Sequence, residues 1–148
     1  MVMIILSPSL LSVDFAHIAD GIAELDRAKV PALHLDVMDG AFVPNISFGA
    51  PVIKCLRKET NMIFDVHLMI EEPDRYLEDF KKAGADWVTV HAESCKHLHR
   101  TVARIHELGI GIQKYPCSIG QRQIVLPSPG YEQLVHFYCF TRLLKIIP

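Results

Sequence analysis

The stretch that decides the fold is Ala32-Leu33-His34-Leu35-Asp36-Val37-Met38-Asp39-Gly40. It is a short apolar run that ends at a glycine, which is typical of a buried β-strand. In a strand, residues i and i+2 share a face and lie about 6.6 Å apart along the axis. His34 and Asp36 therefore point to one side, and the leucines and the valine point to the other. The pair can converge on one ion or substrate, or it can satisfy its own hydrogen bonds in a core, and this stretch leaves both interpretations open.

Similar apolar runs alternate with amphipathic segments from residue 4 to about residue 109. Strands are expected at residues 4–7, around His34, and at residues 62–68 and 87–91. Apolar side chains at helical spacing predict helices over residues 15–25, 51–56, 76–83 and 98–108. Buried strands that alternate with helices pair in parallel through right-handed crossovers, so the pattern predicts an α/β fold.

Polar residues stand where these strands end. From Ser9 to Asp36 is 27 residues, from Asp36 to His67 is 31, and from His67 to His91 is 24. These intervals are close to the roughly 30 residues per unit of a TIM (β/α)8 barrel, and four such units make half of one. Barrels of this kind carry their active sites at the carboxyl ends of the strands. Asp65 and His67 repeat the i, i+2 spacing of the first pair, so a functional site is predicted at these strand ends.

The composition of the 148 residues limits the class of protein. Half of them are hydrophobic (50%), which suffices for one domain with a sizeable core, and a net charge of -2 disfavours a nucleic-acid partner. The apolar opening, residues 1–6, lacks a basic lead and is too short to span a bilayer. The four cysteines include no C-x-x-C pair, so neither a thiolate zinc site nor a redox motif is indicated. We therefore expect a cytoplasmic protein with reduced thiols and no membrane partner.

The sequence changes character at Gly111. All but one of the 17 acidic residues precede it, whereas four basic residues follow it. Pro116, Pro127 and Pro129 argue for an irregular path before residues 133–147, which suit an amphipathic helix or a strand. We therefore divide the chain into the N-terminal half of a β/α barrel, residues 1–110, and an atypical tail, residues 111–148. We hypothesise that the tail arises from a shifted reading frame, an alternative exon or a gene-model error.

Three segments carry a resemblance to a known family. They are Ser7–Phe15 (SPSLLSVDF), His34–Asn45 (HLDVMDGAFVPN) and Phe64–Met69 (FDVHLM). They resemble ribulose-phosphate 3-epimerase, and the resemblance extends from residue 3 to about residue 110. The second segment is highly specific, whereas a bare H-x-D would be weak.

This resemblance implies a TIM-barrel isomerase that interconverts D-ribulose 5-phosphate and D-xylulose 5-phosphate with one divalent metal ion. Matched position by position, the metal ligands would be His34, Asp36 and His67, and Asp36 would also be one of two acid/base aspartates. Ser9, Met38 and His67 would contact the substrate, a phosphorylated ketopentose. A site of imidazoles and carboxylates suits zinc, iron(II), manganese or cobalt.

The tail departs from the family pattern. The second aspartate and the glycine-rich turns that grip the phosphate are expected after residue 111, where the sequence contains no aspartate. An alternative is therefore a non-catalytic half-barrel that binds metal or associates with a full-length epimerase subunit. A half-barrel would expose an apolar sheet edge and inner face, so a homo-oligomer is expected. A hexulose-phosphate synthase or an orotidine phosphate decarboxylase is disfavoured, because their D-x-K-x-x-D motif is missing from the sequence.

Overall fold

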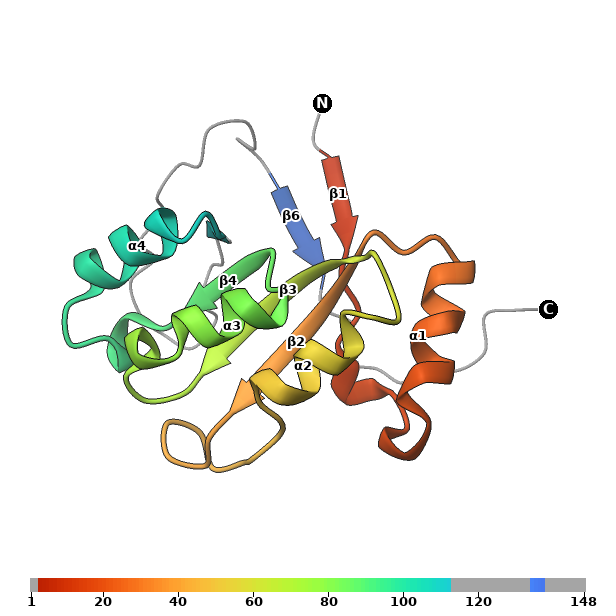
Figure 1. The fold of residues 1–148 in the computed structure, drawn as a ribbon, viewed down its shortest axis with the longest axis horizontal. Coiled ribbons are helices and arrows are strands. Elements are labelled where there is room, and N and C mark those ends of the chain that lie inside the picture. The colour runs from red at the N-terminus through yellow and green to blue at the C-terminus, as the bar shows by residue number, and fades with distance from the viewer. Residues whose placement is uncertain (1–2, 113–133, 138–148) are drawn as a thin grey trace.

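Parallel strands alternate with helices in the computed structural model, which describes residues 3–112 and 134–137 of the chain (Figure 1). The strands are β1 (Met3–Leu6), β2 (Ala32–Met38), β3 (Ile63–Met69), β4 (Trp87–Val90), β5 (Gly111–Ile112) and β6 (Leu134–Phe137). The α-helices are α1 (Ile18–Arg27), α2 (Ala50–Leu56), α3 (Leu77–Ala83) and α4 (Leu98–Glu107). Single 3₁₀ turns are η1 (Leu10–Ser12), η2 (Phe15–His17), η3 (Pro73–Arg75) and η4 (Ala92–Ser94). Within the described residues, no helix is long and apolar enough to cross a membrane.

The order of the strands is that of the first part of a barrel. β2, β3, β4 and β5 form one parallel sheet in this order, and a bridge between Ser9 and His34 joins the segment after β1 to it. The register pairs Asp36 with His67, and His67 with Thr89, so the carboxyl ends of three strands lie level. The predicted α/β fold, built from the first four β/α units of a TIM-type barrel, is confirmed as a partial barrel.

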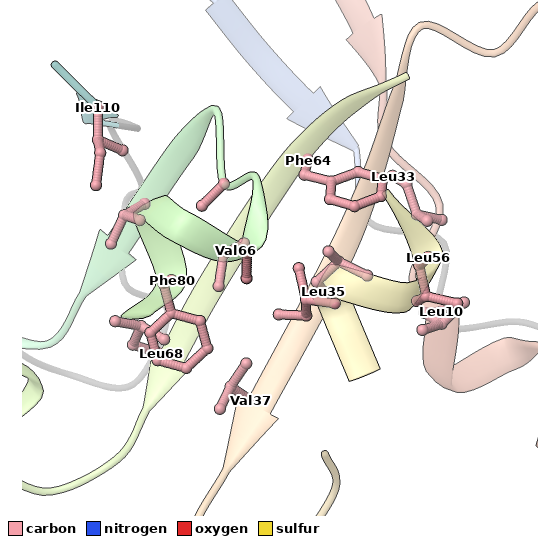
Figure 2. Packing of buried hydrophobic residues seen from close by; sticks show 14 of the residues in the cluster. Leu10, Leu33, Leu35, Val37, Leu56, Phe64, Val66, Leu68, Phe80 and Ile110 are labelled. Carbon is pink, nitrogen blue, oxygen red and sulfur yellow. The ribbon is translucent and has the colours of Figure 1, made fainter. Parts of the chain in front are cut away.

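One face of the sheet packs against the helices and forms the hydrophobic core. Leu33 and Leu35 of β2 and Phe64 of β3 are fully buried in it. Figure 2 shows them in one layer with Leu56 of α2 and Phe80 of α3. Burying each such side chain stabilises the fold by about 1.5–3 kcal/mol. The alternate positions of the same strands point to the opposite face.

That opposite face, which corresponds to the interior of a barrel, is polar at its centre. Ser7, Asp65 and Thr89 are buried there together with His34 and Asp36. This differs from the expected apolar inner face, because the inward positions at the centre of β2 and β3 carry imidazoles and carboxylates that bond to one another. The polar interior positions the site described below.

Part of the tail returns to the start of the chain. β6 runs parallel to β1, and the register pairs Met3 with Leu134 and Leu6 with Phe137. The two strands lie side by side in Figure 1. In a closed barrel the last strand pairs with the first, so β6 takes a place equivalent to that of a last strand. Of the helix or strand expected at residues 133–147, residues 134–137 form a strand, and the other residues lie outside the described part.

Two helices end at glycines with a left-handed backbone, which glycine adopts without strain. Gly84, after α3, has φ +102°, and Gly109, after α4, has φ +64°. A Cβ added at Gly84 would lie 2.5 Å from Arg57 Cδ, whereas one added at Gly109 would meet nothing within 4 Å. The Arg57 side chain cannot move away from position 84 without cost, because its guanidinium donates hydrogen bonds to the carbonyl oxygens of Thr60 and Met62.

We expect Gly84→Ala to lower the free energy of unfolding by about 1–3 kcal/mol, because a side chain at this φ is strained and collides with Arg57. Gly109→Ala is the matched control, since it adds the same methyl group at positive φ in open space, and its loss should be smaller. Urea denaturation of both variants measures the difference. Equal losses at the two positions would show that the contact with Arg57 has no effect.

Candidate metal centre

Two adjacent strands bring the side chains of the predicted site together. β2 supplies His34 and Asp36, β3 supplies Asp65 and His67, and the register pairs His34 with Asp65 and Asp36 with His67. Ser9 comes from the segment after β1, where its Oγ accepts a hydrogen bond from a backbone N–H and begins η1. His67 keeps 21% of its side-chain surface exposed, whereas the other four residues are buried. The cluster is therefore open to solvent on the side of His67.

Three donor atoms of this cluster are placed as the ligands of one metal ion would be. Asp36 Oδ1 lies 3.0 Å from His34 Nε2 and 3.4 Å from His67 Nδ1. One donor atom from each of the three residues lies within 4.8 Å of the others. Tetrahedral coordination with bonds of about 2.0–2.1 Å separates adjacent donors by about 3.3 Å. Since divalent transition metals also favour imidazole nitrogen and carboxylate oxygen, these residues fit such an ion in both geometry and chemistry.

Asp65 fixes the orientation of His34. Its Oδ2 accepts a hydrogen bond from His34 Nδ1 at 2.9 Å, and its side chain is fully buried. This bond leaves His34 Nε2 to face Asp36. Histidines that bind metals commonly donate their other N–H to a carboxylate, which raises metal affinity. From the sequence, no function was assigned to Asp65. Its i, i+2 spacing to His67 was a signal that it lies on the same face as the predicted ligands.

Buried charge shifts the pKa values of this cluster. Burial lowers the pKa of His34, but hydrogen bonds to Asp36 and Asp65 and the charges of both carboxylates outweigh burial and raise that pKa to about 9. Burial raises the pKa of Asp36, but hydrogen bonds with His34, His67 and Ser9 hold it well below its ordinary value. At neutral pH, Asp36 is therefore an ionised carboxylate beside a protonated His34. A metal ion at this site would displace the proton on His34 Nε2.

The family resemblance assigns substrate contacts to both Ser9 and Met38, but the structure puts the two side chains in different surroundings. Ser9 Oγ donates to Asp36 Oδ2 at 2.5 Å, so Ser9 belongs to the cluster. Met38 ends β2 and lines a cavity of about 480 Å³ that Ile46 and Tyr76 also border. Among the described residues, the walls of this cavity include none of the three candidate metal ligands. The structure thus brings Ser9 to the cluster and places Met38 in the wall of this cavity.

His91 follows β4 and extends the row of histidines. Its Nε2 lies 2.8 Å from His67 Nε2, and the centroid of the Phe42 ring lies 4.9 Å from that of His91. Burial lowers the pKa of His91 and the neighbouring His67 lowers it further, so the His91 ring is neutral at neutral pH. His91 therefore lies where the strand-end spacing predicts, one strand beyond His67.

Known proteins resemble most of this chain. The sequence model of the Ribulose-phosphate 3 epimerase family matches residues 5–114. The chain is 51% identical over 108 residues to the ribulose-phosphate 3-epimerase of Bacillus subtilis (strain 168), and the match covers 73% of this chain and 50% of that protein. It is also 51% identical over 108 residues to the chloroplastic ribulose-5-phosphate-3-epimerase of Arabidopsis thaliana, over 72% of this chain and 38% of that protein.

A third relative aligns with more of the tail. The ribulose-phosphate 3-epimerase of Treponema pallidum (strain Nichols) is 48% identical over 156 residues, which cover 96% of this chain and 72% of that protein. This alignment continues beyond residue 114, where the family match ends. The chain spans about half the length of the Bacillus relative. The origin of residues 111–148 from a shifted reading frame, an alternative exon or a gene-model error stays a prediction.

Proposed function

The chain belongs to the ribulose-phosphate 3-epimerase family, and from this premise we propose that it is a metal-dependent epimerase that interconverts D-ribulose 5-phosphate and D-xylulose 5-phosphate. The observation that carries the proposal is the convergence of His34, Asp36 and His67 at the ends of two neighbouring strands. The two sugars differ only in configuration at C3, so the site has to remove and return one proton. The proposed substrate is a phosphorylated ketopentose, and the proposed location is the cytoplasm.

Asp36 is the proposed base of the reaction. It is buried and ionised, its Oδ1 faces the two histidines, and its Oδ2 accepts a hydrogen bond from Ser9. One carboxylate can thus serve as a ligand through one oxygen and take the C3 proton with the other. Ser9 would hold Oδ2 in place beside the substrate. Positioned acid and base groups of this kind contribute about 10²–10⁴-fold to a rate.

His34, Asp36 and His67 would hold the divalent ion, and Asp65 would keep His34 in its binding orientation. When bound, such an ion stabilises the negative charge that develops on the substrate oxygens by several kcal/mol. Zinc, iron(II), manganese and cobalt all suit these donors. His67 would also contact the substrate, and Met38 would border its reacting carbons.

A second candidate function is a non-catalytic half-barrel. Inversion needs an acid on the face of C3 opposite the base, and residues 111–148 contain no aspartate. In the described residues, β5 is a two-residue strand at the edge of its sheet, to which a further strand can add. This edge favours association with a full-length epimerase subunit or with a second copy of the chain.

A coupled epimerase assay on the 148-residue chain distinguishes the two functions. Metal-free protein is supplied with zinc, iron(II) or manganese, and the conversion of ribulose 5-phosphate is followed with and without a chelator. Turnover that stops with the chelator and returns with the metal supports the epimerase. Metal binding without turnover supports the non-catalytic half-barrel, and the absence of both turnover and metal binding would rule out the metal centre.

We expect His67→Ala to lower metal occupancy without unfolding the protein, because it removes one of three ligands at the solvent-exposed side of the cluster. Metal analysis after dialysis measures occupancy, and a thermal melt checks the fold. His99→Ala is the matched control, since His99 is an exposed histidine of α4. If His67→Ala retains as much metal as His99→Ala, His67 is not a ligand.

A further inference from the structure

His67 and His91 meet end to end. Their Nε2 atoms lie 2.8 Å apart, while their ring centroids lie 5.0 Å apart and the ring planes are inclined by 22°. The centroid distance exceeds the nitrogen distance by about the sum of the two ring radii. Each Nε2 therefore points at the other along the line between the rings, which is the geometry of a hydrogen bond between imidazoles.

The proton of this hydrogen bond decides which nitrogen of His67 can bind a metal ion. A neutral imidazole carries its proton on one nitrogen and a lone pair on the other. His67 Nδ1 lies 3.4 Å from Asp36 Oδ1, so Nδ1 faces the metal position. Nδ1 can coordinate only when the His67 proton is on Nε2. That N–H then points at His91 Nε2, which must accept it.

Without a cation, the opposite arrangement is favoured. If His67 Nδ1 is unprotonated, its lone pair faces the ionised carboxylate of Asp36 and the two repel each other. If His67 Nδ1 is protonated, it donates a hydrogen bond to that carboxylate, which is the more stable arrangement. His67 Nε2 then carries the lone pair and accepts from a protonated His91 Nε2. The pair thus has two states with the same number of protons. The hydrogen bond between the two rings runs in opposite directions in the two states, and the bond from His67 Nδ1 to Asp36 is present only in the metal-free one.

We infer that His91 is a positioning residue of the metal centre, and that metal binding reverses its hydrogen bond with His67. In the metal-free protein His91 Nε2–H donates to His67. In the metal-bound protein His67 Nε2–H donates to His91, whose own proton moves to Nδ1 by exchange with water. This inference rests on the proposed metal site. Asp65 accepts the second N–H of the proposed ligand His34, and His91 accepts the second N–H of the proposed ligand His67. The acceptor is a carboxylate in the first case and a neutral imidazole in the second.

The surroundings hold His91 in this position. Its carbonyl oxygen accepts hydrogen bonds from Ser94 N at 3.2 Å, Ser94 Oγ at 3.0 Å and Cys95 Sγ at 3.1 Å. The Phe42 ring packs against the imidazole, and Phe42 N donates to Asp39 Oδ1 at 3.0 Å. Both the backbone and the ring of His91 are therefore restrained by the loops that follow β2 and β4.

The first experiment locates the protons directly. Long-range proton–nitrogen NMR correlations identify the protonated nitrogen of each imidazole in the 148-residue chain, without metal and with zinc. We expect His91 to change from Nε2–H to Nδ1–H when zinc binds, although it is not a ligand, and His67 to change in the opposite sense. His99, on the exposed surface of α4, is the internal control and should not change.

The second experiment removes the acceptor. His91→Met has a side chain of suitable length without a strong acceptor and should weaken zinc binding about 10–100-fold. His91→Gln has nearly the same length with an amide oxygen, so its zinc affinity should stay close to that of the unmodified chain. His91→Phe keeps a ring and provides a second variant without an acceptor. Competition with a chromophoric chelator measures affinity, and thermal melts show which variants are folded.

Two results would overturn the inference while leaving the metal site intact. One is zinc binding that leaves the proton of His91 on the same nitrogen. The other is equal zinc affinity in the folded Met, Phe and Gln variants. If the unmodified chain binds no zinc, the proposed metal site falls, and the inference falls with it.

Discussion

Asp36→Asn is expected to abolish epimerisation, with a loss in turnover of at least about 10²–10⁴-fold. The amide cannot accept the C3 proton, and it brings no negative charge to the metal position between His34 and His67. Zinc affinity should therefore fall together with turnover. The coupled assay measures the first effect, and chelator competition measures the second.

Asp20→Asn is the charge-matched control for this substitution, because Asp20 is an exposed residue of α1 on the surface of the protein. The Asn substitution at position 36 is nearly isosteric, so the fold should persist and a thermal melt can confirm it. Turnover of Asp36→Asn equal to that of the control would remove Asp36 from the mechanism. Lost turnover with unchanged zinc affinity would keep Asp36 as the base and exclude it as a ligand.

Asp65→Ala is expected to lower the free energy of unfolding by about 3–5 kcal/mol, the cost of removing one partner from a buried ion pair. Asp65 is fully buried, and its Oδ2 accepts from His34 Nδ1. Without it, the protonated imidazole keeps a buried N–H with no carboxylate to receive it. Urea denaturation measures the loss, and zinc affinity should also fall about 10–100-fold because the orientation of His34 is no longer fixed.

Asp65→Asn separates the two contributions of this carboxylate. The amide oxygen can still accept from His34 Nδ1, so the orientation of the ring is retained while the negative charge is lost. We therefore expect a stability between those of Asp65→Ala and the unmodified chain. If both variants unfold at the same urea concentration as the unmodified chain, Asp65 does not hold His34.

The alternation of side chains along a strand made much of the centre predictable from sequence. His34 and Asp36 are two residues apart and had to share a face in any extended conformation. The repeat of β/α units placed His67 at the end of the neighbouring strand, and the register pairs it with Asp36. The helices were equally predictable, since their apolar stripes match the buried face of the sheet.

Features that depend on a rotamer or on a distant partner had no comparable signal. The two-residue spacing between Asp65 and His67 predicts which face of β3 carries Asp65. It does not predict which nitrogen of His34 the Asp65 carboxylate contacts. The spacing of His91 likewise places it near His67 without showing that their Nε2 atoms meet. β6 has four residues and follows a proline-containing segment, and nothing in that short stretch of sequence identified β1 as its partner.

The pairing of β1 with β6 also sets the order in which the protein can assemble. It joins residues 3 and 134, whereas β2 and β3 join residues 32 and 63. Closing the longer loop costs more chain entropy, and contacts between distant segments slow folding. During synthesis the sheet of β2, β3 and β4 can form before β6 has left the ribosome, while β1 still lacks that neighbour. Until β6 pairs with it, β1 is therefore open to pairing with the wrong strand.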